Sequence, residues 1–169
     1  MSNKFTDIIF SRRSIRKYTS QKVDEGDVKI LLEAAMAAPS ASNRRPWHFV
    51  VVTERKTLDK LAESHKYGKM LFDAPLCIVV CGDLAVAERF WVQDCSAATE
   101  NILLAATSIG LGAVWLGVHP SEGRVSDVRG ILEIPEGYTP LNLISIGHPD
   151  EEKESRTQYE AGKVHSEKW

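Results

Sequence analysis

A short basic segment near the amino terminus, SRRSIRKY at residues 11–18, carries residue types that are well suited to binding an anion. Arg12, Ser14 and Arg16 alternate along it, so their side chains point to one side if the chain is extended. Two guanidinium groups and a hydroxyl on one side fit a phosphate and the polar edge of a ring. Taken alone, the segment is explained better as a solvated basic loop.

Two further segments could bring backbone groups close to a flat ligand. PSASNRRPW, residues 39–47, has short polar side chains, and Asn43 can both donate and accept hydrogen bonds. Leu116 and Gly117 end a run typical of a buried strand, and glycine permits close approach of a ligand to the backbone. An ordinary loop rich in Ser and Pro, and an ordinary strand end, are the alternative interpretations.

The sequence does not favour other familiar kinds of site. The five histidines are scattered, and the glycine fingerprints of Rossmann and P-loop nucleotide sites are absent. Cys77, Cys81 and Cys95 are odd in number and form no CxxC pair, which argues against a disulfide framework and against a zinc site. We expect these thiols to be buried in the core and the protein to hold no metal.

The composition is that of a globular protein: 43% of the 169 residues are hydrophobic and 26% are charged. A net charge of -2 with a local basic cluster suits a small anion better than a polyanion, so we expect no nucleic-acid partner. The start, MSNKFTDIIFSRR, does not resemble a secretory signal, and no uncharged run is long enough for a membrane span. We expect a cytoplasmic protein that forms one domain over residues 1–169 and does not interact with membranes.

Helical periodicity alternates with short β-branched runs, which predicts helices packed on a sheet in an α/β or α+β arrangement. Capping is expected from Asp24, with Asp27 in the capping-box position, and from Ser121. The expected helices cover residues 5–10, 24–38, a stretch around Leu58 to Ala62, 85–109 and 121–130, and the expected strands cover 48–53, 76–83, 113–118 and 139–147.

Two segments suggest a second subunit. The stretch from Cys95 to Ile109 is apolar nearly all round, so a protein of this size could bury it fully only with help from a partner. The stretch from Pro149 to Trp169 is charged and almost free of aliphatic residues, yet it ends in Trp. It could be a disordered tail or an arm anchored on a neighbouring surface.

Five motifs, in this order, resemble those of the nitroreductase family in its short single-domain branch. They are RRSIRKY, PSASNRRPWHFVVV, GLGAVWLGVHP, IPEGYTPLNLISIGHP and EEKESRTQYEAGKVHSEKW, and together they span nearly the whole chain. The resemblance implies an α+β fold with a central, mostly antiparallel sheet flanked by helices. It also implies a homodimer with the long buried helix at its interface, an arm over residues 149–169 that wraps the partner, and two FMN molecules bound between the subunits.

The resemblance assigns binding residues one by one. Arg12, Arg156 and Lys153 would hold the FMN phosphate, and Ser14 and Arg13 would contact the phosphate or the ribityl chain. Arg16 would lie near the N1/O2 edge of the ring and stabilise reduced FMN. Leu116 and Gly117 would present backbone near the reactive ring nitrogen, and Lys69 would also reach the flavin. The partner subunit would contribute one loop: Pro39, Ser40, Ala41, Ser42 and Asn43.

The implied activity is reduction of nitroaromatics, quinones or related electrophiles by NADH or NADPH in a ping-pong, two-electron mechanism. The chain departs from the family pattern at Arg45, where glutamine is usual, which places an extra charge beside the flavin. Only residues 84–90 stand where longer members carry a gating helix, so a more open substrate site is expected. The alternatives are a flavin-binding or redox-sensing module without turnover, or another reductive reaction of the same superfamily.

Overall fold

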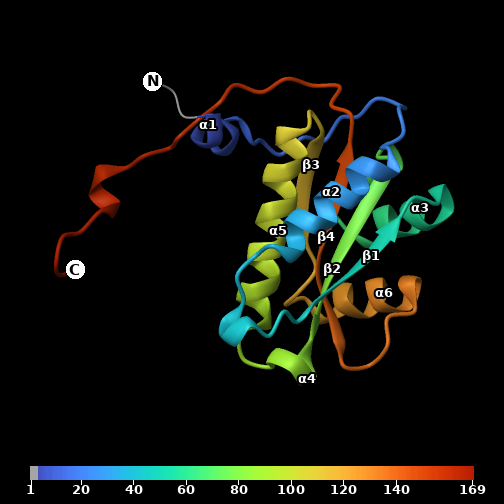
Figure 1. Ribbon diagram of the computed structural model, residues 1–169. Helices are drawn as coiled ribbons and strands as arrows, with labels where there is room; N and C mark the ends of the chain where they lie inside the picture. The colour runs from blue at the N-terminus through green and yellow to red at the C-terminus, as the bar shows by residue number, and fades with distance from the viewer. Residues whose placement is uncertain (1–3) are drawn as a thin grey trace.

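A four-stranded antiparallel sheet forms the centre of the structure, with helices on both faces (Figure 1). The computed structural model describes residues 4–169. The strands are β1 (Trp47–Val52), β2 (Leu76–Asp83), β3 (Gly112–Gly117) and β4 (Tyr138–Gly147), in the spatial order β1-β2-β4-β3. Every neighbouring pair is antiparallel. The predicted α+β class with a mostly antiparallel sheet is therefore confirmed.

The helices form two layers, with α2 and α5 on one face of the sheet and α3 and α6 on the other. Their bounds are α1 (Lys4–Ser11), α2 (Glu25–Met36), α3 (Arg55–Ser64), α4 (Leu84–Ala87), α5 (Trp91–Ser108) and α6 (Glu122–Leu132), with single turns η1 (Ala41–Asn43), η2 (Lys69–Phe72) and η3 (Ala161–Lys163). Within residues 4–169, no helix combines the length and apolarity that crossing a lipid bilayer requires.

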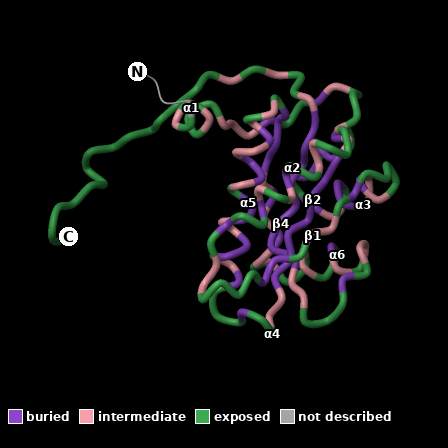
Figure 2. Tube along the Cα trace, in the orientation of Figure 1, coloured by how far each residue is buried: buried purple, intermediate pink, exposed green. Residues whose placement is uncertain are grey.

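The two central strands, β2 and β4, separate two apolar cores. Because side chains alternate along a strand, Ile78 and Val80 pack toward α2 and α5, while Cys77 and Val79 pack toward α3 and α6. Figure 2 shows the buried residues gathered in these strands and along one side of α5. All three cysteines are free and buried, as predicted, and burial raises the pKa of each thiol to about 12.

The expected helix over residues 85–109 is wrong in its first part, because the chain forms α4, breaks, and starts again as α5. Asp83 caps α4 by accepting hydrogen bonds from the N–H groups of Ala85 and Val86. The break lets the ring of Trp91 lie flat on β2, where a side chain at Gly82 would collide with it. Trp91, the first residue of α5, thus packs closely against Gly82 of β2.

Two helix starts were predicted correctly, but the predicted capping bonds were not. Asp24 and Ser121 occupy the residues before α2 and α6, yet neither side chain makes a capping hydrogen bond. Two helix ends also differ from prediction, since α2 stops at Met36, before Pro39, and α6 continues past Gly130 to Leu132.

The last residues extend away from the sheet as an arm (Figures 1 and 2). Residues 157–169 are all exposed, and Trp169 is 101% exposed. An extended carboxyl-terminal arm was predicted, and it is present.

We expect Gly112→Ala to destabilise the fold by about 1–3 kcal/mol, the typical cost of overpacking. A Cβ at Gly112 would lie 2.6 Å from Cγ2 and 2.8 Å from Cβ of Ile15, and a β-branched side chain has little freedom to move aside. Urea denaturation measures the loss. Gly130→Ala is the matched control, because a Cβ there meets nothing within 4 Å; an equal loss in the control would contradict this explanation.

Candidate functional site

The segment that follows α1 is held against the start of β3. Ser14 forms a parallel bridge with Ala113, and the Ile15 N–H donates to the Ala113 carbonyl at 3.0 Å. The buried hydroxyl of Tyr18 donates to the carbonyls of Ile15, at 2.7 Å, and Ser145, at 3.1 Å. These bonds fix the backbone of residues 14–18 against the sheet.

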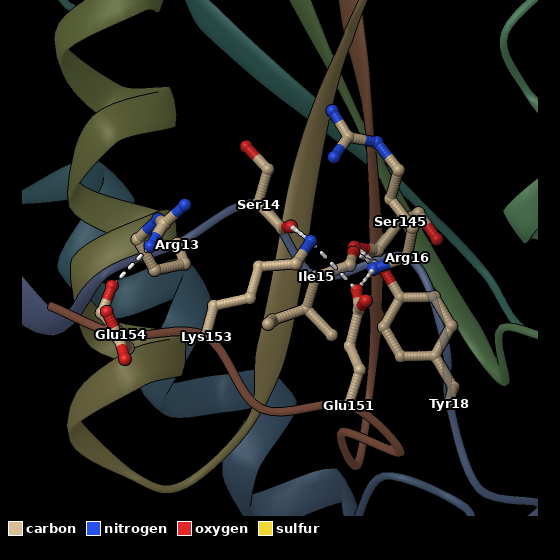
Figure 3. A network of polar contacts seen from close by, with 9 residues as sticks. All are labelled: Arg13, Ser14, Ile15, Arg16, Tyr18, Ser145, Glu151, Lys153 and Glu154. Carbon is tan, nitrogen blue, oxygen red and sulfur yellow. Dashed lines mark hydrogen bonds and ion pairs between the residues drawn. The ribbon is translucent and has the colours of Figure 1, made fainter.

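Burying Ile15 turns its neighbours outward. Figure 3 shows the Ser14 hydroxyl and the Arg16 guanidinium pointing to the same side, as the alternation predicted for an extended segment. Arg13 lies the other way and donates to the backbone carbonyl of Glu154. Arg13 therefore ties the segment to the beginning of the arm, and its predicted contact with a ligand stays a prediction.

The beginning of the arm runs beside this segment and completes a group of cations. The ammonium of Lys153 donates to the Ser14 carbonyl at 2.6 Å, and the Arg156 N–H donates to the Phe10 carbonyl at 3.1 Å. Residues far apart in sequence are thus brought to one place. We call them the basic cluster: Arg12, Arg13, Arg16, Lys153 and Arg156.

Two carboxylates that the sequence analysis missed act on this cluster. Glu100 of α5 lies 3.7 Å from the Arg12 guanidinium, and partial burial raises its pKa against the opposing effect of Arg12. Glu151 accepts a hydrogen bond from the Arg16 N–H at 2.6 Å and pairs with Lys153 at 3.1 Å. The hydrogen bond from Arg16 is the main reason that the pKa of Glu151 is lowered.

The outer edge of β3 presents backbone groups beside the basic cluster. The Val118 N–H donates to the Leu141 carbonyl at 3.0 Å, so Gly117 and Asn142 form the next, non-hydrogen-bonded pair of the ladder. The N–H and carbonyl of Gly117 therefore point away from β4. Along β3, Ala113 and Gly117 are about 13 Å apart at the usual rise of a strand.

The Gly117 carbonyl is held by two side chains that sequence reasoning did not single out. Nε2 of His65 lies 2.9 Å from this oxygen, and Nη1 of Arg124 donates to it at 3.0 Å. Nδ1 of His65 accepts from the Tyr67 N–H at 3.1 Å, so the ring proton belongs on Nε2, which donates. A scattered histidine and an arginine on a surface helix give no sequence signal of this role.

Lys69 lies in η2, shortly after His65, and its side chain is exposed. Its neighbour Met70 packs in the same core cluster as Ile15 and Leu116, which places η2 on this side of the sheet. In residues 4–169 the Lys69 ammonium makes no hydrogen bond or ion pair, so its predicted contact with a ligand stays a prediction.

The loop over residues 39–45 lies at the other end of α5 (Figure 1). Its turn η1 is held by the buried Asp94, which accepts from the Ala41 N–H at 2.9 Å. Ser42, Asn43 and Arg45 adopt left-handed backbone angles, with φ of 54°, 54° and 51°, and their side chains are exposed. Such a conformation is costly for residues other than glycine and is often associated with ligand contacts.

One subunit does not bring this loop to the basic cluster. From Asp94, which holds Ala41, to Glu100, which faces Arg12, α5 rises about 9 Å, and residues 14–18 lie farther along, at the start of β3. The predicted residues therefore fall into two groups. The first group is the basic cluster with Ser14 at the start of β3, followed along the strand by Leu116 and Gly117, with Lys69 in η2. The far end of β3 runs toward the start of α5, where the ring of His119 lies 4.8 Å from that of Trp91. The second group is Pro39, Ser40, Ala41, Ser42, Asn43 and Arg45.

The arrangement can bind an anionic group at the basic cluster and the polar edge of a flat molecule at the edge of β3. Within residues 4–169, no three His, Cys, Asp or Glu side chains gather in a way that could hold a metal ion. A family model described as Nitroreductase family matches residues 9–148. The chain belongs to the nitroreductase family.

Known members of the nitroreductase family resemble this chain over nearly its full length. A protein of Methanothermobacter thermautotrophicus, provisionally named NADH dehydrogenase/NAD(P)H nitroreductase, is 48% identical over 165 residues, covering 96% of this chain and 86% of the relative. A crystal structure from Bacteroides thetaiotaomicron with the same provisional name has a TM-score of 0.97 at 42% identity and covers 100% of both chains. A structure from Desulfovibrio desulfuricans, provisionally named a nitroreductase and in complex with FMN, has a TM-score of 0.86 at 31% identity, covering 100% of this chain and 99% of the other.

We expect the contact between Glu151 and the Arg16 N–H to weaken in acid. Because the pKa of Glu151 is lowered on folding, its stabilisation is present above the ordinary value of 4.5 and is lost as pH falls through the lowered pKa. The free-energy difference of unfolding between wild type and Glu151→Gln should therefore be largest near neutral pH and shrink toward pH 3. A difference that does not depend on pH over this range would show that the carboxylate charge is unimportant.

Proposed function

We propose that the protein is an FMN-dependent oxidoreductase that uses NAD(P)H to reduce nitroaromatics, quinones or related electrophiles. The observation that carries this proposal is the basic cluster beside the outward-facing edge of β3. A single molecule would fit both features if it carries an anionic group and a flat polar ring, joined by a chain about as long as the distance between them. The FMN-containing relative from Desulfovibrio desulfuricans supports FMN as that molecule.

The phosphate of FMN would bind Arg12, Lys153 and Arg156, with Ser14 and Arg13 at the phosphate or the ribityl chain. This assignment fits the structure because the arm already holds Lys153 against the Ser14 carbonyl at 2.6 Å. The stretch of about 13 Å along β3 from Ala113 to Gly117 is comparable with a ribityl phosphate chain plus part of the ring that it carries.

At the ring, FMN supplies the hydride-accepting nitrogen when it is bound. The Gly117 N–H faces outward and would meet the ring edge, and His65 and Arg124 prevent this strand end from rotating. The guanidinium of Arg16 would stabilise negative charge at the N1/O2 edge. Lys69 would approach from η2.

The reaction balances with a single donor and a single acceptor. NAD(P)H gives up a hydride, a proton comes from water, and a quinone leaves as a quinol while NAD(P)⁺ is released. The segment α4, which stands beside the loop over residues 39–45, is only four residues long, so we infer that donor and acceptor use the same open face in turn. Such alternation gives ping-pong kinetics.

The second group of residues would complete the site from a partner subunit, so the proposal includes a homodimer. An apolar groove between α1, α2 and α5 is open in the single subunit and could be covered by a partner. It is lined by Phe5, Ile8, Ala34, Ala37, Asn101, Leu104, Ala105 and Ser108. A partner packed along α5 would bury this groove and present its own residues 39–45, Arg45 included, to the flavin.

The arm after Arg156 would then lie on the partner, with Trp169 as its anchor. In its own subunit residues 157–169 are exposed, and a buried Trp covers on the order of 200 Å². We also propose a cytoplasmic location. The three cysteines are free, as a reducing compartment would leave them.

The proposed function predicts a flavin absorption band in the purified protein and steady-state NAD(P)H oxidation with a quinone. Arg12→Ala should weaken FMN binding about 10- to 100-fold, because a charge-assisted hydrogen bond contributes roughly 1.5–3 kcal/mol. Fluorescence titration measures the affinity. Glu100→Gln is the control, because it removes the paired carboxylate and leaves the guanidinium, so FMN should bind as well or better. Unchanged affinity in Arg12→Ala would refute the phosphate assignment, and a flavin band without turnover would indicate a binding module.

Deleting residues 158–169 tests the role of the arm in assembly. We expect a looser dimer with a lower Tm and weaker FMN binding, because Arg156 is kept while the anchor on the partner is lost. Sedimentation velocity over a range of concentrations gives the dimer affinity, and Trp169→Ala should reproduce part of the effect. A flavin-loaded monomer, full-length or truncated, would contradict a site shared between subunits.

A further inference from the structure

A hollow of about 230 Å³ lies between the loop over residues 39–45 and α4. It is lined by Ala41, Ser42, Arg44, Ala87, Arg89 and Phe90. Two of these residues are arginines, and Phe90 is an aromatic side chain that is 44% exposed. The lining thus combines positive charge with an accessible flat ring.

Both arginines are held in place by uncharged groups. Nη1 of Arg44 donates to the Val86 carbonyl at 3.1 Å, and the Arg89 guanidinium lies 5.4 Å from the centre of the Phe90 ring. These contacts restrict the two side chains without neutralising them, so each keeps donors and a full positive charge for another partner.

Two arginines of this protein pair with carboxylates, whereas the arginines at the hollow do not. Arg12 pairs with Glu100 and Arg55 with Asp59. Within residues 4–169, Arg44, Arg45 and Arg89 have no carboxylate oxygen within 4.0 Å.

Three acidic groups stand near the hollow, and none pairs with these arginines. Asp94 is buried and accepts from the N–H of Ala41, which lines the hollow, at 2.9 Å. Asp83 accepts from the N–H groups of Ala85 and Val86, and its other oxygen lies 4.0 Å from His48. Glu88 is exposed beside Arg89. The two arginines at the hollow therefore keep donors for an anion, although the nearby carboxylates offset part of their charge.

The position of the hollow connects it to the proposed active site. Ala41 and Ser42 line it, and they belong to the loop proposed to face the flavin of the partner subunit. We propose that the hollow is an anion subsite that selects substrates carrying a carboxylate or phosphate on a planar ring system. The anion would bind Arg44 and Arg89, and the ring would stack on Phe90. This inference rests on the proposed function, whose substrate class it specifies.

Such an anion could come from the electron acceptor or from the 2′-phosphate of NADPH, and two sets of measurements distinguish them. The first compares kcat/KM for 4-nitrobenzoate with that for the uncharged 4-nitrobenzamide, using NADH. The second compares NADPH with NADH, using an uncharged quinone. We expect the charged substrate to be favoured in at least one comparison, and Arg44→Gln and Arg89→Gln each to reduce that preference about tenfold.

Lys60→Gln is the matched control, because it removes one positive charge from an exposed position of α3 and should leave both ratios unchanged. A readout independent of turnover is calorimetric binding of adenosine 2′-monophosphate against adenosine, and of benzoate against benzamide. A preference confined to the nucleotides identifies the donor phosphate, and one confined to the benzoates identifies the acceptor.

The subsite would be overturned if the kcat/KM ratios for charged against uncharged substrates were the same in both arginine variants as in the wild type. It would also be overturned if Lys60→Gln changed these ratios by an equal amount. Neither result would contradict the proposed function, provided that the wild type carries flavin and oxidises NAD(P)H with the uncharged quinone. Loss of those two properties in the wild type would instead refute the proposed function.

Discussion

The docking of residues 14–18 on the start of β3 is the constraint on which the rest of the site depends. One backbone hydrogen bond, from Ile15 to Ala113, and one buried side chain, Ile15 against Gly112, set the position of this segment. Ser14 and Arg16 then face outward because a residue between them faces inward. The arm brings Lys153 to the carbonyl of Ser14 in this same segment.

Helix α5 separates the predicted binding residues into two groups, and this separation links cofactor binding to assembly. Glu100 in its middle faces Arg12, while Asp94 near its start holds the Ala41 N–H. Because the loop and Arg12 contact α5 about 9 Å apart along its axis, one subunit holds the loop and the basic cluster apart. In the proposed dimer, a second copy of α5 runs alongside the first. The loop of each subunit then lies against the basic cluster of the other. Weakening the dimer would then weaken FMN binding without any change in the phosphate contacts.

The sequence predicted the features that follow from local patterns. The strand over residues 76–83 was correct at both ends, and the alternation of Ser14 and Arg16 gave their shared direction. The break before Trp91 was missed, because it depends on a ring that lies on Gly82 of another element. His65 and Arg124 were missed for a related reason: their shared partner is a backbone carbonyl more than fifty residues from His65, and no periodicity records it. The pattern suggested an anion site at Arg12, Ser14 and Arg16, whereas most of the residues proposed to bind FMN came from the resemblance alone.

The cationic side chains of the protein differ in how many of their hydrogen-bond donors remain free for a ligand. Lys153 already serves the Ser14 carbonyl and Glu151, so much of its bonding capacity supports the fold. Arg12 has one distant carboxylate partner at 3.7 Å, and a doubly charged phosphate would outcompete it. Arg44 and Arg89 have only neutral partners. A fixed cofactor that stays through many turnovers would suit the first pair, because Lys153 is held by a backbone carbonyl and Arg12 by Glu100. An exchanging substrate suits the second pair, because an exposed anion site in water binds more weakly and releases more quickly.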